Sequence, residues 1–211
     1  ISHTDEVDPL NEQWSCEAGA FLPATNPRRV CRGFVWTNGR MGALPTFGGT
    51  HGFATGVNNK GEVVGWAETP VFDPTCDAAR GEGDQKLQFR AALWNPKKGT
   101  MTELQPYPGD SASAATAINE RGQVVGISGE CDQAVGRFSA RRSVIWDRGS
   151  VDTLPTLGGT AWHTPMDIND HGVVVGLGEQ VGAPAVAGEH QGGVGRPAVD
   201  HLAELLVGRG R

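Results

Sequence analysis

Residues 57–65 of this chain are VNNKGEVVG, and the pattern returns as INERGQVVG at residues 118–126 and as INDHGVVVG at residues 168–176. In each copy the Asn side chain can accept hydrogen bonds from the backbone two residues on, and the Gly three positions later can close a tight turn with positive φ. The Val-Val-Gly that follows is typical of a short strand whose glycine lets another backbone approach closely. Each copy therefore predicts a β-hairpin.

Two further elements precede each hairpin. A short apolar segment ends in a tryptophan, at Trp36, Trp94 and Trp146, with steps of 58 and 52 residues. A bend follows, LPTFGGT at residues 44–50 and LPTLGGT at residues 154–160, whereas the second copy has LQPYPGD at residues 104–110 and lacks the paired glycines. Proline cannot donate to a sheet and paired glycines permit positive φ, so these stretches predict bends between strands. We expect the three tryptophans to be rings of the core.

The three copies predict an all-β chain of tandem four-stranded antiparallel repeats, β-propeller-like, with about four blades or an open partial array. We expect one repeat domain over residues 1–211. Its predicted parts are a partial N-terminal unit at 1–33, three repeats at 34–91, 92–143 and 144–195, and a partial C-terminal unit at 196–211.

The two ends of the chain allow more than one architecture. The segment around Cys16 resembles the last strand of a unit, and residues 196–205 resemble the opening of one, with Asp200 in place of the tryptophan. Pairing of residues 10–16 with residues 196–206 would close a small ring. The alternatives are open edges that pair with another subunit, or a short helix over residues 200–207.

The recurring tryptophan, the Gly-Gly-Thr bend and the Asn-x-x-Gly hairpin together resemble the HAF repeat family, over about residues 34–178. That family is known mainly from bacterial proteins predicted to be extracellular. The resemblance implies a propeller-like fold and an extracellular or periplasmic location. It implies no catalytic residues.

Composition excludes some functions. A net charge of -6 and a pI near 5.5 argue against nucleic-acid binding, which needs a concentrated basic face. No apolar run reaches the length of a membrane span. The start at Ile1 suits a mature secreted protein or a trimmed domain. Four cysteines fit disulfides better than a metal site, and of the three connectivities we predict Cys16 with Cys31 and Cys76 with Cys131, as local pairs.

The candidate catalytic residues are His163, Asp167 and His51. Both histidines lie beside Gly-Gly-Thr bends, and histidine is the commonest general base, although a packing role explains each equally simply. Asp167 stands where the other copies have Gly56 and Ala117, so it is either a loop anchor or a reactive carboxylate.

Other residues are candidates for binding. Trp66 and Trp162 are aromatic residues that the repeat does not explain, and with Tyr107 of the second bend they could stack on a sugar or another small molecule. The acidic residues of one inter-repeat loop make calcium an alternative to a solvated loop, with no other cofactor expected; they are Asp73, Asp77, Glu82 and Asp84.

The sequence thus favours a secreted scaffold that binds a ligand or partner, carbohydrate included, at the rim formed by the bends. The alternative is an extracellular hydrolase with a His/Asp site on the same rim. A third possibility, a homo-oligomer formed through open edges, is compatible with either.

Overall fold

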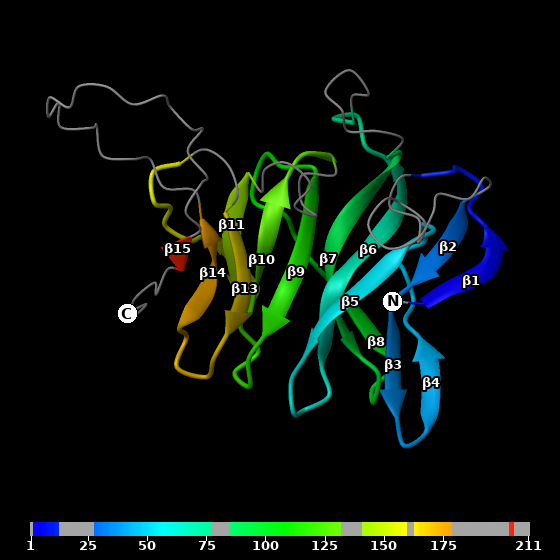
Figure 1. Cartoon of the computed structure of the whole chain (residues 1–211), viewed down its shortest axis with the longest axis horizontal. Helices are drawn as coiled ribbons and strands as arrows, with labels where there is room; N and C mark the ends of the chain where they lie inside the picture. The colour runs from blue at the N-terminus through cyan, green and yellow to red at the C-terminus, as the bar shows by residue number, and fades with distance from the viewer. Residues whose placement is uncertain are drawn as a thin grey trace, which may run out of the picture.

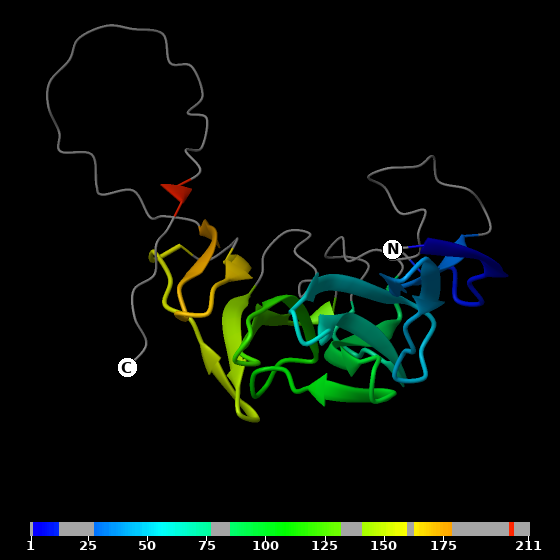
Figure 2. The ribbon, with the colours of Figure 1, turned by 90° about the horizontal axis from the view of Figure 1, so that it is seen from below.

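The computed structural model describes residues 2–12, 28–76, 85–131, 141–159, 163–178 and 203–204. These residues form antiparallel sheets and contain no helix, so the predicted all-β class is confirmed. The sheets stand side by side in a row that does not close on itself (Figures 1 and 2), as expected for an open partial array. Within the described ranges the chain has no helix that could cross a membrane.

Two sheets are complete, with four strands each. The first has the order β5-β6-β7-β8 and the second the order β12-β11-β10-β9. Their strands are β5 (Gly52–Val57), β6 (Val63–Phe72), β7 (Leu87–Asn95), β8 (Thr100–Leu104), β9 (Ala112–Ile118), β10 (Val124–Gly129), β11 (Arg142–Asp147) and β12 (Ser150–Thr153).

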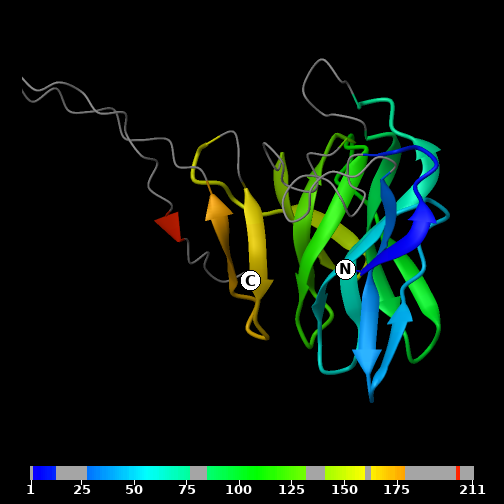
Figure 3. The same ribbon diagram turned by 45° about the vertical axis from the view of Figure 1, so that its right-hand side comes forward.

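Partial sheets lie at the two ends of the row (Figure 1). At one end β1 pairs with β2, and β3 pairs with β4; at the other end the order is β13-β14-β15. Their strands are β1 (Ser2–Val7), β2 (Arg29–Arg32), β3 (Phe34–Thr37), β4 (Arg40–Ala43), β13 (Thr164–Ile168), β14 (Val174–Gly178) and β15 (Ala203–Glu204). The alternative of ring closure, by pairing of residues 10–16 with 196–206, can be compared only at residues 10–12 and 203–204, the described parts of these segments, and these lie at opposite ends of the row (Figure 3).

Each complete sheet combines parts of two sequence repeats. Its first two strands are the small-residue strand and the Val-Val-Gly strand of one repeat, and its last two are the tryptophan strand and the strand after it from the next repeat. The hairpin at each Asn-x-x-Gly joins the first two strands. A sheet therefore cannot be completed by one repeat alone.

The predicted hairpin turns are confirmed. Asn58 Oδ1 accepts the backbone N–H of Glu62 at 3.0 Å, and Asn169 Oδ1 accepts that of Val173 at 3.0 Å. Gly61 has φ of 81°, the left-handed conformation that closes the turn. The asparagines also join neighbouring sheets, since Asn58 Nδ2 donates to the backbone carbonyl of Asn119 at 3.2 Å.

The structure also explains why each Val-Val-Gly segment ends in glycine. A Cβ on Gly65 would lie 1.9 Å from the carbonyl oxygen of Phe53, and one on Gly126 would lie 2.1 Å from that of Ala114. Next to each of these contacts the pairing of the two strands shifts by a bulge. Any side chain at either glycine would push the two strands apart.

Candidate functional site

The repeated tryptophans form the junctions between successive sheets. Trp94 on β7 faces Val63 on β6, and its indole N–H donates to the carbonyl of Pro45 at 2.9 Å, in the bend that follows the preceding sheet. The ring is 2% exposed. We name the surface around it the first tryptophan pocket, which consists of Leu44, Phe47, Ala54, Val63 and Ala67.

The second junction repeats this geometry. Trp146 on β11 faces Val124, and its indole N–H donates to the carbonyl of Gln105 at 2.7 Å. Gln105 follows Leu104 as Pro45 follows Leu44, so the acceptor is the equivalent atom. The second tryptophan pocket consists of the equivalent residues Leu104, Tyr107, Ala115 and Val124.

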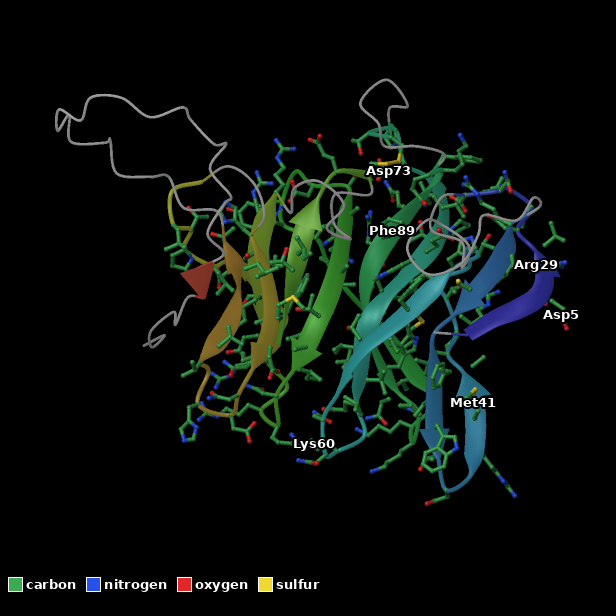
Figure 4. The ribbon with its side chains drawn as sticks, viewed as in Figure 1. Asp5, Arg29, Met41, Lys60, Asp73 and Phe89 are labelled. Carbon is green, nitrogen blue, oxygen red and sulfur yellow. A yellow bond between two sulfur atoms is a disulfide. The ribbon has the colours of Figure 1, made fainter. Side chains whose placement is uncertain are left out.

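Trp36 occupies the equivalent position on β3 but is 63% exposed. The prediction that all three tryptophans are core rings is therefore wrong for Trp36. Met41, its partner on β4, is 61% exposed as well and lies on the outermost hairpin of the row (Figure 4). The cause is position: β1 and β2 precede this hairpin, but the described residues before it contain no bend equivalent to residues 44–50 that could cover the ring as Pro45 covers Trp94.

At the opposite end an open hollow lies at the position equivalent to the first two tryptophan pockets. Its walls carry the residues equivalent to those of the first tryptophan pocket, and they include Pro155, the counterpart of Pro45, whose carbonyl accepts the indole N–H of Trp94. We name this hollow the third tryptophan pocket; its defining residues are Leu154, Leu157, Pro165, Val174 and Gly178.

A second feature is a cluster of buried polar side chains around His51. Asp8, Glu12, His51, Glu68 and Gln85 are each at most 2% exposed. Among the described residues, no Lys or Arg side chain forms an ion pair with these groups. The cluster fastens the segment after β1 to the first complete sheet.

Gln85 links the two glutamates of the cluster. Its Nε2 lies 3.1 Å from Glu12 Oε1 and 3.2 Å from Glu68 Oε1. Glu12 Oε1 also accepts the backbone N–H of Leu87 at 2.7 Å, and Glu68 Oε2 accepts that of His51 at 2.7 Å. Glu12 Oε2 and Gln85 Oε1 are buried without a hydrogen-bond partner. If Glu12 carries a proton, one of its oxygen atoms becomes a hydrogen-bond donor instead of a further acceptor.

Burial controls the charge of these carboxyl groups. Burial, with the Glu68 carboxylate as a second cause, raises the pKa of Glu12 from 4.5 to about 7. Burial also raises the pKa of Glu68. For Asp8, burial acts in the same direction, but the contact with His51 and the backbone N–H groups of Leu10 and Glu12 outweigh it and lower the pKa.

The cluster has the side-chain types of a metal site, but its hydrogen bonds are those of protonated side chains and not of metal ligands. Asp8, Glu12 and His51 each offer a donor atom, and these atoms lie within 4.8 Å of one another. However, His51 Nδ1 accepts the backbone N–H of Cys31 at 3.1 Å, so the proton of the neutral ring is on Nε2. That nitrogen lies 3.2 Å from Asp8 Oδ2 without hydrogen-bond alignment, an electrostatic contact. A metal on Nε2 would place two N–H groups against each other at Cys31.

We therefore expect zinc and chelators to leave the melting temperature unchanged. A metal present at 100 times its dissociation constant would stabilise the fold by about 2.7 kcal/mol, which corresponds to a rise of several degrees. Thermal unfolding with zinc, with calcium and with EDTA measures this. A rise in melting temperature with zinc that His51→Gln abolishes would show instead that the cluster binds a metal.

The structure does not bring the predicted catalytic residues together. His51 is fully buried in the cluster described above. The ring of His163 is buried at the wall of the third tryptophan pocket, and its Nε2 lies 2.8 Å from the carbonyl of Gly159. Asp167 is exposed on β13, where its carboxylate accepts the backbone N–H of Ile168 at 2.8 Å. Each residue thus has a local structural role.

The predicted ligand-binding aromatics have different environments. Trp66 is 5% exposed and stacks on Phe53, with ring centroids 4.6 Å apart, so its ring is closed to a ligand in this structure. Tyr107 is half-buried, and the guanidinium of Arg142 lies 5.0 Å from its ring centroid. Trp162 lies outside the described residues.

The acidic loop is described only at Asp73. This carboxylate accepts hydrogen bonds from the Thr75 and Ser111 hydroxyls at 2.6 and 2.8 Å, beside the disulfide Cys76–Cys131 at one end of the sheets (Figure 4). Its oxygens are thereby used in fastening the loop to the second sheet. Asp77, Glu82 and Asp84 lie outside the described residues, so calcium binding there stays a prediction.

The predicted disulfide Cys76–Cys131 is confirmed, with an S–S distance of 2.02 Å. Cys31 is disulfide-bonded too, and its predicted partner Cys16 lies outside the described residues.

No protein-family model matches the chain, and no curated protein matches it.

Sequence reasoning missed Asp8, Glu12, Glu68 and the third tryptophan pocket. One signal was present, since Glu68 is the charged residue in the run of residues 63–72, in which Thr69 is the other polar residue. A carboxylate there requires buried partners.

Proposed function

We propose that this chain is a binding scaffold rather than an enzyme, and that it binds other proteins by adding their strands to its two end sheets. Strand addition uses free sheet edges for affinity and side-chain pockets for specificity. Both requirements have support among the described residues: at one end β3 pairs with β4 alone beside Trp36, and at the other end Val174, Val175 and Gly176 of β14 have no described partner on the side of β15, next to the third tryptophan pocket.

One observation carries the proposal. A surface that is buried at both internal junctions is open at the ends: Trp94 and Trp146 are 2% and 5% exposed, whereas Trp36 is 63% exposed. An exposed tryptophan beside an exposed methionine is uncommon on a monomeric surface unless a partner covers it.

The bends themselves are less suited to binding. The carbonyls of Pro45 and Gln105 already accept indole N–H groups, and the backbone N–H groups of Thr50 and His51 donate to Glu68. These contacts consume the polar groups that a ligand at the rim would need. The hydrolase alternative has less support, because His163 and Asp167 each bond to nearby backbone instead of to each other.

We further infer an oxidising compartment. The disulfide Cys76–Cys131 joins two different sheets, and such bonds persist outside the cytosol. This agrees with the extracellular location that the resemblance to HAF repeats implies; membership of that family stays a prediction.

The proposal is tested with a synthetic hairpin that contains a repeat tryptophan. The probe is a labelled peptide of residues 87–104, which carries Trp94, and the receptor is the Trp36→Ala chain, whose own hairpin can no longer compete. We expect saturable binding. A Trp94→Ala peptide is expected to bind at least about tenfold more weakly, because loss of the ring and its N–H bond exceeds 1.4 kcal/mol.

Filling the pocket provides the control. A Cβ on Gly178 would make an ordinary contact with Leu157 at 3.5 Å, so Gly178→Leu can fold while its side chain fills the third tryptophan pocket. This substitution in the receptor should abolish peptide binding. Equal binding of both peptides, or none by either, would refute the proposed function.

A further inference from the structure

The hairpin turns of the sheets gather at one edge of the row. Six antiparallel pairs turn there, opposite the bends that follow Leu44, Leu104 and Leu154 (Figures 1 and 2). Lys60 lies at this edge and Asp73 at the other (Figure 4). We name this edge the hairpin rim, which consists of residues 37–40, 58–62, 95–100, 119–123, 147–150 and 169–173.

Every turn of the hairpin rim carries a basic side chain. All of these side chains are exposed: Arg40, Lys60, Lys97, Lys98, Arg121, Arg148 and His171. The Asn-x-x-Gly turn requires only its asparagine and its glycine, yet Lys60, Arg121 and His171 all occupy its third position. The fold therefore does not explain this row of basic residues.

The cations of the hairpin rim are almost free of acidic partners. Among the described residues, the one ion pair there joins Arg148 to Asp147, at 3.9 Å. At the opposite edge, two arginines at the start of β11 are ion-paired: Arg141 with Glu130 and Arg142 with Asp110. Lys97 Nζ donates to the backbone carbonyl of Lys60 at 2.9 Å, which brings two basic turns together.

The carboxylates of the hairpin rim are held between its turns. Glu120 Oε1 accepts the backbone N–H of Asn59 at 2.6 Å, and Asp170 Oδ1 accepts that of Glu120 at 2.8 Å. The other two accept amide side chains: Glu62 from Asn58 and Asp147 from Gln123. Six Lys or Arg residues against four carboxylates leave the rim with a charge of +2, in a chain whose net charge is -6.

We propose that the hairpin rim binds a linear acidic polysaccharide, which lies along the row of turns. The basic side chains contact its charged groups, Lys60 and Arg121 on neighbouring sheets being the central pair. The hydrogen bonds between turns hold this surface in place before the ligand binds. The proposal goes beyond strand addition, because it uses an edge that the end sheets leave free.

The spacing of the charges favours a polysaccharide over DNA. A duplex carries one charge about every 1.7 Å, whereas packed sheets lie about 10 Å apart, so one or two cations per turn would face several phosphates. The carboxylates of the rim would repel the others. A sugar chain has hydroxyl groups that donate hydrogen bonds to such carboxylates, and the DNA backbone has none.

A protein partner is less suited to the hairpin rim. Protein interfaces bury a core of apolar and aromatic side chains. The exposed residues of these turns are polar, apart from the glycines and Pro96.

The test measures binding of the full chain to immobilised polygalacturonate by surface plasmon resonance. Its methyl ester is the matched probe, with the same backbone but no charge. We expect saturable binding to the acid form and at least about tenfold weaker binding to the ester. Raising the salt from about 50 to about 200 mM should weaken binding at least about fivefold, because salt screens exposed charges.

Charge reversal locates the surface. Lys60→Glu with Arg121→Glu should weaken binding at least about tenfold, and Lys98→Glu with Arg148→Glu should weaken it in the same direction. Lys86→Glu with Arg141→Glu is the matched control, since it changes the net charge equally at the opposite edge, and it should bind as the natural chain does. The side chains of Lys60 and Arg121 make no hydrogen bond with described residues, so thermal unfolding of that variant should be unchanged.

Three results would overturn the proposal. The first is equal binding to the acid and to its methyl ester. The second is an equal loss of binding in the Lys60/Arg121 and Lys86/Arg141 variants, which would mean that net charge and not the hairpin rim decides. The third is tighter binding to duplex DNA or to polyglutamate than to polygalacturonate, which would assign the rim to a nucleic acid or to an acidic protein.

Discussion

Replacing Trp94 with alanine is expected to lower the free energy of unfolding by about 4 kcal/mol, the range for large aromatic residues removed from a core. The ring is 2% exposed and joins two sheets, so the substitution opens a cavity at a junction. It also leaves the Pro45 carbonyl without its 2.9 Å hydrogen bond. Urea unfolding at a fixed protein concentration measures the loss.

Two variants separate the contributions. Trp94→Phe keeps most of the apolar volume but removes the indole N–H, so about 1–2 kcal/mol should be lost. Phe72→Ala truncates an aromatic residue that is 62% exposed and should change stability by less than about 0.5 kcal/mol. If Trp94→Ala and Phe72→Ala had equal effects, the junction would not be what holds the sheets together.

The repeated elements of the fold were predictable because their causes are local. The Asn-x-x-Gly turn depends on one side chain that bonds its own backbone and one glycine with positive φ, and both are visible in the sequence. The close approach at Gly65 follows in the same way, since a strand that needs a residue without Cβ can contain only glycine.

The exposure of Trp36 was not predictable from its pattern. Its surroundings in sequence match those of Trp94 and Trp146, and all three lie on equivalent strands. Their burial differs because a pocket is contributed by the preceding bend, which is a neighbour in the array and not in the sequence. A repeat determines what a residue can contact, and its place in the row determines whether the contact is made.

The grouping of strands into sheets was hidden for a related reason. A periodic sequence has no marked starting point, so a unit can be taken to begin at any of its four strands. The buried acidic cluster was hidden because its members do not repeat: Glu12 and Gln85 come from segments that join or precede the sheets. Only the folded chain brings them to Glu68.

Stability is expected to fall as the pH rises from about 5 to 8, because of Glu12. The pKa of Glu12 rises from its ordinary value of 4.5 to about 7 in the fold. Below pH 4.5 the group is protonated in both the folded and the unfolded chain. Between these values only the unfolded chain releases the proton, so unfolding becomes easier, and above 7 the whole penalty of a buried charge is present. The difference corresponds to about 3 kcal/mol.

Two other carboxyl groups of the cluster set the limits of the pH range in which stability falls. Glu68, whose pKa is also raised by burial, adds to the slope in the same direction. Asp8 acts oppositely at the acid end, since its lowered pKa supplies stability that is lost as the pH falls through the folded value. Stability should therefore be greatest in mildly acidic solution.

Glu12→Gln identifies the source of the slope. The amide keeps an oxygen for the N–H groups of Lys86 and Leu87 and carries no charge to bury. Urea unfolding at pH 5, 6, 7 and 8 should show a shallower dependence in this variant, which becomes more stable than the natural chain at pH 8. Glu6→Gln, an exposed residue of β1, should keep the natural slope. Parallel curves for all three proteins would mean that Glu12 carries no proton in the fold, and the buried pair with Glu68 would then need another counter-charge.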